Sequence, residues 1–256
     1  MRVHRTPPHL DAATRAQIEK SAGSWESVSV AGNDGVLVRA WYLTPRSLER
    51  GCVIALHGIG DSRASSAQFA KFLLPAGYAV LAADLRGHGE SGGDLVTYGL
   101  KESGDVAAWA RWLRSRGCLA VFGVGESLGG AVLIQAAEAA GLRAVVAECA
   151  FQDMASIAVD RVGSAVIVKA AFWWAWLRYG VDIESASPMR SAARTRIPIL
   201  LIHGLQDDRT RPSHSEAIAR VALNARLWLV PNAGHTGAWA AAPQEFPVRV
   251  LEWLAF

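Results

Sequence analysis

The chain contains 256 residues, of which 51% are hydrophobic and 19% are charged. This composition excludes disordered, collagen-like and low-complexity proteins, and the length suffices for one domain, residues 1–256, with a large buried core. The net charge is only +3, from 26 basic and 23 acidic residues, and no run of lysine or arginine occurs. The sequence therefore shows no electrostatic footprint for binding nucleic acid.

The cysteine content and the N-terminal residues bear on the cellular location. Cys52, Cys118 and Cys149 are too few and too widely spaced for a disulfide framework or a zinc motif, although they allow one pair. Residues 1–30 contain no apolar segment typical of a signal peptide. A reducing, cytoplasmic location is the simplest interpretation.

The first elements along the chain are a polar segment and a hairpin. Residues 8–22 are typical of a polar helix or arm. Residues 27–30 and 36–43 are apolar or alternating, and they flank the sequence Gly-Asn-Asp-Gly at 32–35. Because Asn, Asp and Gly tolerate positive φ, this pattern predicts an antiparallel β-hairpin.

From residue 51 onward, short apolar segments alternate with segments of helical periodicity. The apolar segments are rich in Val, Leu, Ile and Ala and are bounded by Gly or Pro, which is typical of parallel strands buried on both faces. We therefore expect a doubly wound α/β fold with a mostly parallel sheet of about eight strands and the hairpin at one edge. The expected parallel strands are residues 52–56, 78–83, 119–124, 144–147, 197–202 and 227–230.

The interval between residues 147 and 197 contains no clear strand. We expect residues 151–195 to form a helical lid over the carboxyl ends of the strands, where open α/β sheets bind ligands. Its apolar segment 162–177 contains Lys169 and is shorter than the roughly 20 residues that a membrane-spanning helix needs. A hydrophobic helix packed on the protein is favoured over contact with a membrane surface. Its aromatic residues either bind an apolar part of the substrate or pack the lid on the core; they are Phe172, Trp173, Trp174 and Trp176.

The strongest local motif is Gly-Glu-Ser-Leu-Gly at residues 125–129, which follows one predicted strand and opens a predicted helix. In the pattern G-x-S-x-G, the glycines let two backbone segments crowd a sharp turn, and the serine stands at its tip as a nucleophile. A second match at residues 89–93 contains Ser91, but it lies in a glycine-rich loop without a preceding strand or a following helix. The context favours Ser127.

A serine nucleophile requires a base and an acid that orients the base. In this architecture they follow the serine in the order acid, then histidine. Asp207 and Asp208 both follow the strand predicted at 197–202, and His235 follows the strand predicted at 227–230. These groups leave the same sheet edge as Ser127, so the sequence predicts a Ser-His-Asp triad with either aspartate as the acid.

Two backbone N–H groups are expected to bind the oxyanion of the reaction intermediate. They belong to Leu128, directly after the nucleophile, and to Ile59, in the small-residue loop after the strand at 52–56. No H-E-x-x-H motif or comparable ligand spacing occurs, so we expect no metal and no cofactor. Glu126 and Glu148 either line the pocket or cap local structure.

The chain resembles the α/β-hydrolase superfamily of serine hydrolases, especially its esterase and serine-aminopeptidase-like branch. The resemblance rests on LHGIGDSR at 56–63, DLRGHGESGG at 84–93, GVGESLGG at 123–130, HGLQDDRTRP at 203–212 and NAGH at 232–235. It implies that Ser127 is the nucleophile, Asp207 the acid and His235 the base. It also implies an oxyanion hole from Ile59 and Leu128 and a lid over an acyl pocket.

The resemblance makes carboxylic ester hydrolysis the expected activity, with small to medium apolar acyl groups bound by Phe172, Trp173 and Trp176. A peptidase, an amidase or a thioesterase would use the same triad. A dinucleotide-binding oxidoreductase is a distant alternative, because the glycine-rich turn at 123–129 follows a strand. However, that fingerprint requires glycine at position 128, where this chain has leucine.

Overall fold

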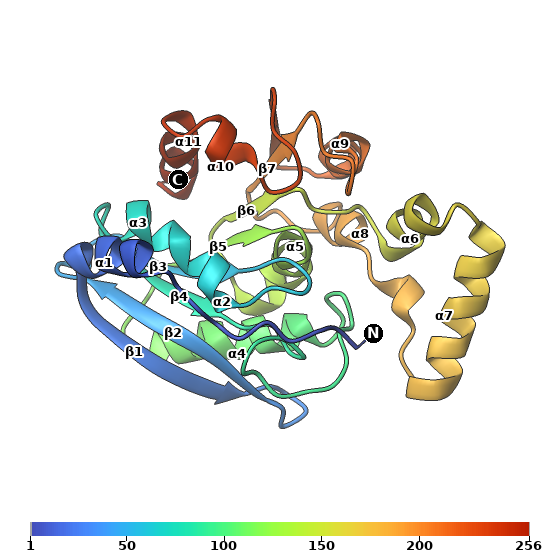
Figure 1. Cartoon of the computed structure of the whole chain (residues 1–256), viewed down its shortest axis with the longest axis horizontal. Helices are drawn as coiled ribbons and strands as arrows, with labels where there is room; N and C mark the ends of the chain where they lie inside the picture. Colours follow the sequence, from blue (N-terminus) through green and yellow to red (C-terminus); the bar gives the residue numbers. More distant parts are fainter. Residues whose placement is uncertain (1, 256) are drawn as a thin grey trace.

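The computed structural model describes residues 2–255, and its strands form one mostly parallel sheet (Figure 1). Within these residues, the sheet has eight strands in the order β1-β2-β4-β3-β5-β6-β7-β8. β1 pairs antiparallel with β2, and β2 with β4, whereas the remaining neighbours are parallel. The predicted α/β fold with an antiparallel edge hairpin is confirmed. The strands are β1 (Ala22–Ala31), β2 (Leu37–Pro45), β3 (Gly51–Leu56), β4 (Tyr78–Ala83), β5 (Val121–Glu126), β6 (Val145–Glu148), β7 (Ile199–Gly204) and β8 (Ala225–Val230).

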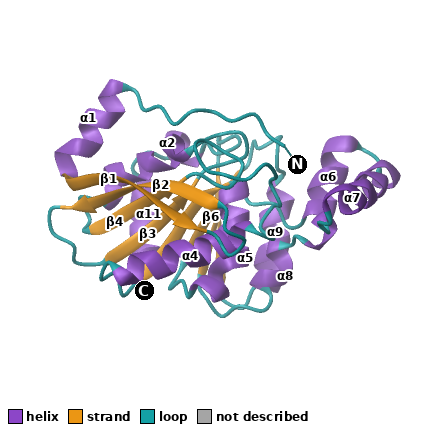
Figure 2. Cartoon of the chain, turned by 90° about the horizontal axis from the view of Figure 1, so that it is seen from below, coloured by secondary structure: helices purple, strands orange, loops and turns teal. Residues whose placement is uncertain are grey.

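Helices cover both faces of the sheet, so a separate apolar core lies on each side (Figure 2). The core of one face includes side chains from α4, α5, α8 and α9, and that of the other includes side chains from α1, α3, α10 and α11. The helices are α1 (Ala12–Ser21), α2 (Arg63–Ser66), α3 (Ala70–Leu73), α4 (Glu102–Ser115), α5 (Leu128–Ala140), α6 (Met154–Val162), α7 (Ala165–Tyr179), α8 (Pro188–Ala192), α9 (Pro212–Val221), α10 (Ala238–Ala241) and α11 (Glu245–Leu254), with 3₁₀ turns η1 (Ala67–Phe69) and η2 (Ile183–Ser185).

The strand centres agree with the sequence prediction, but several ends differ. β5 begins at Val121, two residues later than predicted, because Leu119 lies in the preceding turn and is 90% exposed. It ends at Glu126, since this residue still pairs with Glu148 of β6. β1 begins five residues before the predicted hairpin, at Ala22, directly after α1. An exposed edge strand carries a weaker apolar pattern, so its start is harder to predict.

The segment between β6 and β7 is helical, as expected, and contains α6, α7, η2 and α8. α7 lies at the edge of the molecule, away from the sheet, in both views (Figures 1 and 2). Only Val168 and Ala175 of this helix are buried. Among residues 2–255, no helix has the length and apolar character needed to cross a bilayer.

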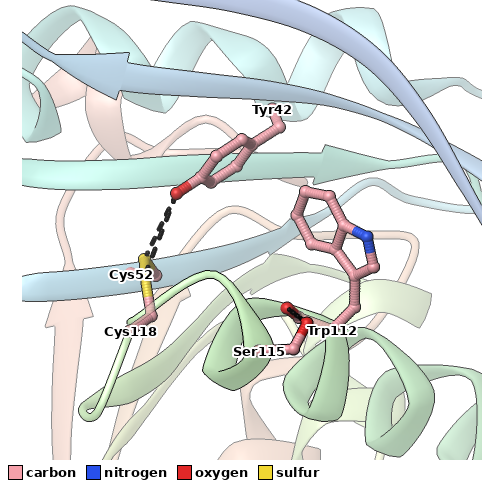
Figure 3. Close-up of a disulfide and its surroundings, with 5 residues drawn as sticks. All are labelled: Tyr42, Cys52, Trp112, Ser115 and Cys118. Atoms are coloured by element: carbon pink, nitrogen blue, oxygen red, sulfur yellow. Dashed lines mark hydrogen bonds between the residues drawn. A yellow bond between two sulfur atoms is a disulfide. The ribbon is translucent and has the colours of Figure 1, made fainter.

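A disulfide joins Cys52 at the start of β3 to Cys118 in the turn between α4 and β5, with their Cα atoms 6.0 Å apart (Figure 3). Both residues are buried, and the Tyr42 hydroxyl lies 3.9 Å from each sulfur atom. The one pair that three cysteines allow is therefore present, while Cys149 is free. The cytoplasmic location stays a prediction, and the disulfide removes the argument from cysteine content that favoured a reducing compartment.

The disulfide is expected to stabilise the fold, because it closes a loop between residues 66 positions apart and thereby restricts the unfolded chain. In the chain-entropy account, a Cys118→Ser variant should lose about 4 kcal/mol of unfolding free energy relative to the oxidised protein. Urea unfolding with and without reductant measures this difference. If reductant destabilised the variant as much as the wild type, the effect would not arise from this bond.

Candidate active site

The turn between β5 and α5 places Ser127 at the carboxyl edge of the sheet. Ser127 has φ 49° and ψ −113°, a strained conformation for a residue with a side chain, and its N–H donates to the Glu148 carbonyl at 2.7 Å. A Cβ atom at Gly129 would lie 2.5 Å from the Leu56 carbonyl oxygen, so only glycine lets the helix approach β3 this closely. The G-x-S-x-G spacing is therefore required by the backbone itself.

His235 connects Ser127 to Asp207. Its Nε2 atom lies 3.0 Å from the Ser127 Oγ atom, and its Nδ1 atom lies 2.8 Å from an Asp207 carboxylate oxygen. An ionised carboxylate only accepts hydrogen bonds, so Nδ1 of His235 carries the proton and Nε2 is free to accept the serine proton. Residues separated by 108 positions in the sequence thus form one continuous hydrogen-bonded chain.

The surroundings of Asp207 favour its ionised form. Burial of the carboxyl group acts to raise its pKa, but hydrogen bonds from His203, His235 and the Thr210 N–H outweigh burial and hold the pKa below its ordinary value. The N–H groups of Arg209 and Thr210 each donate to the carboxylate at 2.9 Å. Asp207 can therefore keep a negative charge beside His235 although it is almost inaccessible to solvent.

The structure also distinguishes Asp207 from Asp208, between which the residue pattern left a choice, and Ser127, which the sequence context favoured, from Ser91. Asp208 is exposed, and Asp207 is buried against His235. Ser91 is fully buried, and its hydroxyl donates to the Asp84 carbonyl at 2.8 Å and accepts from the Arg39 N–H at 2.8 Å. The Ser91 hydroxyl therefore ties a loop to the sheet.

A buried thiol also lies at this site. Cys149 follows β6, has φ 51°, and hydrogen bonds to Asp207, while its sulfur accepts from the Thr236 N–H at 3.4 Å. Cys149, His203 and Asp207 each offer an atom within 4.8 Å of the others, so together they could hold a metal ion. Such an ion would have to displace the hydrogen bonds that Asp207 receives from His203 and His235. In the structure, Cys149 and His203 instead hydrogen bond to Asp207 and hold its carboxylate in place.

Leu128 directly follows Ser127, and the loop that contains Ile59 passes beside Ser127. Leu128 is the first residue of α5, so no carbonyl inside the helix can accept its N–H. Ile59 lies in the loop after β3, and a Cβ atom at the adjacent Gly58 would be 3.6 Å from the Ser127 Cβ atom. The loop therefore passes directly beside the nucleophile, with Ile59 half exposed.

A cavity of about 480 Å³ lies at this edge of the sheet, and its wall includes Glu126 and Thr236, the sequence neighbours of Ser127 and His235. The sequence analysis did not identify this cavity. Its walls combine loops after β3 and β8 with short helices, and no single motif indicates that combination. The other lining residues are Asp61, Ser65, Gln68, Phe69, Lys71, Trp239, Ala240 and Pro243.

Two glutamates at this edge have raised pKa values. Burial, followed by the charges of Glu148 and Asp61, raises the pKa of Glu126 to about 8. Burial also raises the pKa of Glu148 to about 7, against the effect of the Ala238 N–H, which donates to its carboxylate at 2.9 Å. The sequence left open whether these glutamates line a pocket or cap local structure. In the structure, Glu126 lines the cavity, and Glu148 accepts the hydrogen bond from the first N–H of α10.

Glu126→Gln is expected to stabilise the protein at alkaline pH. The raised pKa means that the folded protein binds more protons than the unfolded chain between about pH 4.5 and about pH 8. Wild-type stability should fall as the pH rises through this window, and glutamine, which stays neutral, should remove this part of the loss. At about 1.4 kcal/mol per pKa unit, we expect the variant to be up to about 5 kcal/mol more stable than wild type above the window and equal to it below. Urea unfolding at both ends measures this, and a difference independent of pH would contradict it.

The predicted substrate-binding aromatics have different environments. Phe172 is half-buried and lines a cavity of about 370 Å³ between α6 and α7. Trp173 and Trp176 are 62% and 55% exposed. Both tryptophans point toward solvent in this conformation, so their contact with a substrate stays a prediction.

The comparisons with known proteins agree with this architecture. The family model described as "Alpha/beta hydrolase family" matches residues 53–252. The uncharacterized protein YqkD of Bacillus subtilis is 26% identical over 93% of this chain and 80% of its own length.

Solved structures share the whole fold. The esterase Pf2001 of Pyrococcus furiosus superposes with a TM-score of 0.79 at 24% identity, covering 100% of this chain and 98% of the esterase. Acetyl xylan esterase 1 from Thermoanaerobacterium gives a TM-score of 0.71 at 16% identity, covering 98% of this chain and 94% of the other.

Proposed function

Because the chain belongs to the alpha/beta hydrolase family, we propose that it is a serine hydrolase that cleaves carboxylic esters, with Ser127, His235 and Asp207 as its catalytic residues. The observation that carries this proposal is the continuous hydrogen-bonded chain from the Ser127 hydroxyl through His235 to the Asp207 carboxylate. A serine hydrogen-bonded to a base that an acid orients is the arrangement that activates a nucleophile for acyl transfer through a covalent intermediate.

In the proposed reaction, the Ser127 Oγ atom attacks the ester carbonyl carbon while Nε2 of His235 removes the hydroxyl proton. The bond to the alcohol then breaks, and His235 returns the proton to the leaving oxygen, which leaves an acyl group on Ser127. Water attacks this acyl group by the same route, releases the acid and restores the serine. The Asp207 carboxylate stabilises the imidazolium that forms in both halves.

The backbone N–H groups of Ile59 and Leu128 are proposed to bind the negative oxygen of each tetrahedral intermediate. Each donor of this kind typically contributes about 3 kcal/mol to stabilisation of the transition state. The positive end of the α5 dipole lies at the same place and favours the same charge.

Small to medium apolar acyl groups fit the site best. The cavity of about 480 Å³ that Glu126 and Thr236 line has an aromatic part of its wall, formed by Phe69 and Trp239, which suits an apolar acyl group. The structural relatives Pf2001 and acetyl xylan esterase 1 are esterases by name. Within the predicted lid, Phe172, Trp173 and Trp176 remain proposed contacts for the substrate.

A fluorophosphonate probe tests the nucleophile, because it reacts covalently with activated serines. We expect one adduct by intact mass, mapped to the peptide that contains Ser127. A parallel panel of p-nitrophenyl esters of increasing acyl length, with a thioester and an aminoacyl amide, measures the substrate class. Labelling at Ser91, or active protein without any label, would contradict the proposed nucleophile, and faster cleavage of the amide or thioester would contradict the ester preference.

A further inference from the structure

The surface of α7 carries large apolar side chains that no other part of the described chain covers. Val166, Trp173 and Trp174 are 79%, 62% and 60% exposed, and the neighbouring Ile167 and Leu177 are also more than half exposed. Isolated apolar residues on a protein surface are ordinary, but a contiguous patch on one helix marks a site that binds another apolar surface.

The exposed residues of α7 and the residues that pack on the protein lie on different faces of this helix. Val168, Phe172 and Ala175 are buried or half-buried, and their spacing of four and three residues places them on one face of α7, the inner face. At 100° per residue, the opposite face contains only apolar side chains. This outer face consists of Val166, Ile167, Ala170, Trp173, Trp174 and Leu177, all of them exposed.

The charges of α7 flank the outer face. Lys169 and Arg178 lie on its two opposite sides, and the helix contains no acidic residue. Within residues 2–255, neither side chain takes part in an ion pair. Lys169 also lines the cavity between α6 and α7, whose wall includes Asp160 and Glu184, but it forms no ion pair with either carboxylate.

We propose that α7 docks onto an anionic lipid surface, with its outer face in the boundary between headgroups and acyl chains. Tryptophan is favoured at this boundary, and lysine and arginine at the sides of a helix reach the lipid headgroups while their aliphatic parts stay in apolar surroundings. α7 is too short to span a bilayer but is shaped to lie in its plane. The proposal rests on the geometry of α7 and does not depend on the proposed ester hydrolysis.

The charge pattern favours lipid over a second copy of the chain. A symmetric dimer would place the outer face of one α7 against that of another. Lys169 and Arg178 of both copies would then surround the contact, and α7 offers no carboxylate to neutralise them. An anionic lipid surface supplies the missing negative charge.

Sedimentation with lipid vesicles tests the proposal on the full-length protein. Wild type should bind vesicles of mixed phosphatidylcholine and phosphatidylglycerol more tightly than pure phosphatidylcholine vesicles, and added salt should weaken the binding. Each basic residue near an anionic surface contributes about a fivefold gain in partitioning. A K169Q/R178Q variant should therefore bind the mixed vesicles about 25-fold more weakly.

The apolar contribution is tested with an I167S/W174S variant, which should lose binding to both kinds of vesicle. Leu119 and Leu223 are exposed apolar residues outside α7, so L119S/L223S is a matched control that should bind like wild type. R46Q/R50Q is the corresponding control for charge, because both arginines are exposed and lie between β2 and β3. Thermal melting checks that each variant is folded.

Three results would overturn the proposal. The first is that wild type does not bind the mixed vesicles, and the second is that both α7 variants bind them as tightly as wild type. The third is a lipid-free dimer in analytical ultracentrifugation that I167S/W174S converts to monomer, because the outer face would then serve association between copies.

Discussion

Replacing Ser127 by alanine is expected to lower kcat for ester hydrolysis by about 10⁶-fold, the loss typical of removing the nucleophile from a serine-histidine-aspartate arrangement. The variant keeps the oxyanion donors and the cavity, so KM should change little. Ser127 occupies a strained backbone position, but alanine needs no more space than serine. Steady-state kinetics with a p-nitrophenyl ester measures the effect.

Ser91 provides the matched control for this result, because it belongs to the second G-x-S-x-G sequence of the chain. Ser91→Ala removes a hydroxyl that joins the Arg39 N–H to the Asp84 carbonyl. It should cost about 1–3 kcal/mol of stability, the usual effect of leaving buried polar groups unpaired, with kcat almost unchanged. Substantial activity in Ser127→Ala together with its loss in Ser91→Ala would assign the nucleophile to the other motif.

The fold could be predicted from the sequence because most strands are buried on both faces and therefore appear as short apolar segments. The strand predicted at residues 78–83 has the observed bounds of β4, since both of its faces are buried and it appears as an uninterrupted apolar segment. The residues proposed as nucleophile, acid and base could also be identified from the predicted strands. Each follows the carboxyl end of a parallel strand, so parallel alignment alone brings them to one edge.

The surroundings of these residues could not be predicted in the same way. The cavity depends on how Trp239 of α10 approaches Phe69 of η1, with ring centroids 6.0 Å apart, and these residues are distant in the sequence. Cys149 follows β6 but contacts Asp207 and Thr236, which follow β7 and β8, so these contacts depend on how the three strands are arranged in the sheet. Such contacts arise from tertiary packing and leave no local period in the sequence.

The helical segment between β6 and β7 shows a further limit of sequence patterns. Its apolar helix was identified, but apolar side chains lie on both the inner and the outer face of α7, so periodicity could not indicate which side chains face the protein. The structure shows that Val168 and Ala175 are buried while Trp173 and Trp176 are exposed. An apolar composition therefore predicted a helix at this place without predicting its orientation.

Asp207→Asn is expected to lower kcat by about 10⁴-fold, because the substitution reverses the hydrogen bonding of His235. The Asp207 carboxylate now accepts a hydrogen bond from Nδ1 of His235 at 2.8 Å. The amide group of asparagine can donate to Nδ1 instead, which moves the ring proton to Nε2. A protonated Nε2 cannot accept the proton of Ser127, although the positions of all three residues are retained. Steady-state kinetics should show a loss in kcat with KM nearly constant.

Asp208→Asn is the control, since it makes the same chemical change one residue away on an exposed side chain. It should alter kcat by no more than about twofold, as is usual for surface substitutions. A large loss in Asp208→Asn with normal activity in Asp207→Asn would move the acid by one position. Equal, small losses in both variants would mean that His235 is oriented without a carboxylate. The difference between these neighbouring variants therefore measures what the buried negative charge of Asp207 contributes to the proposed reaction.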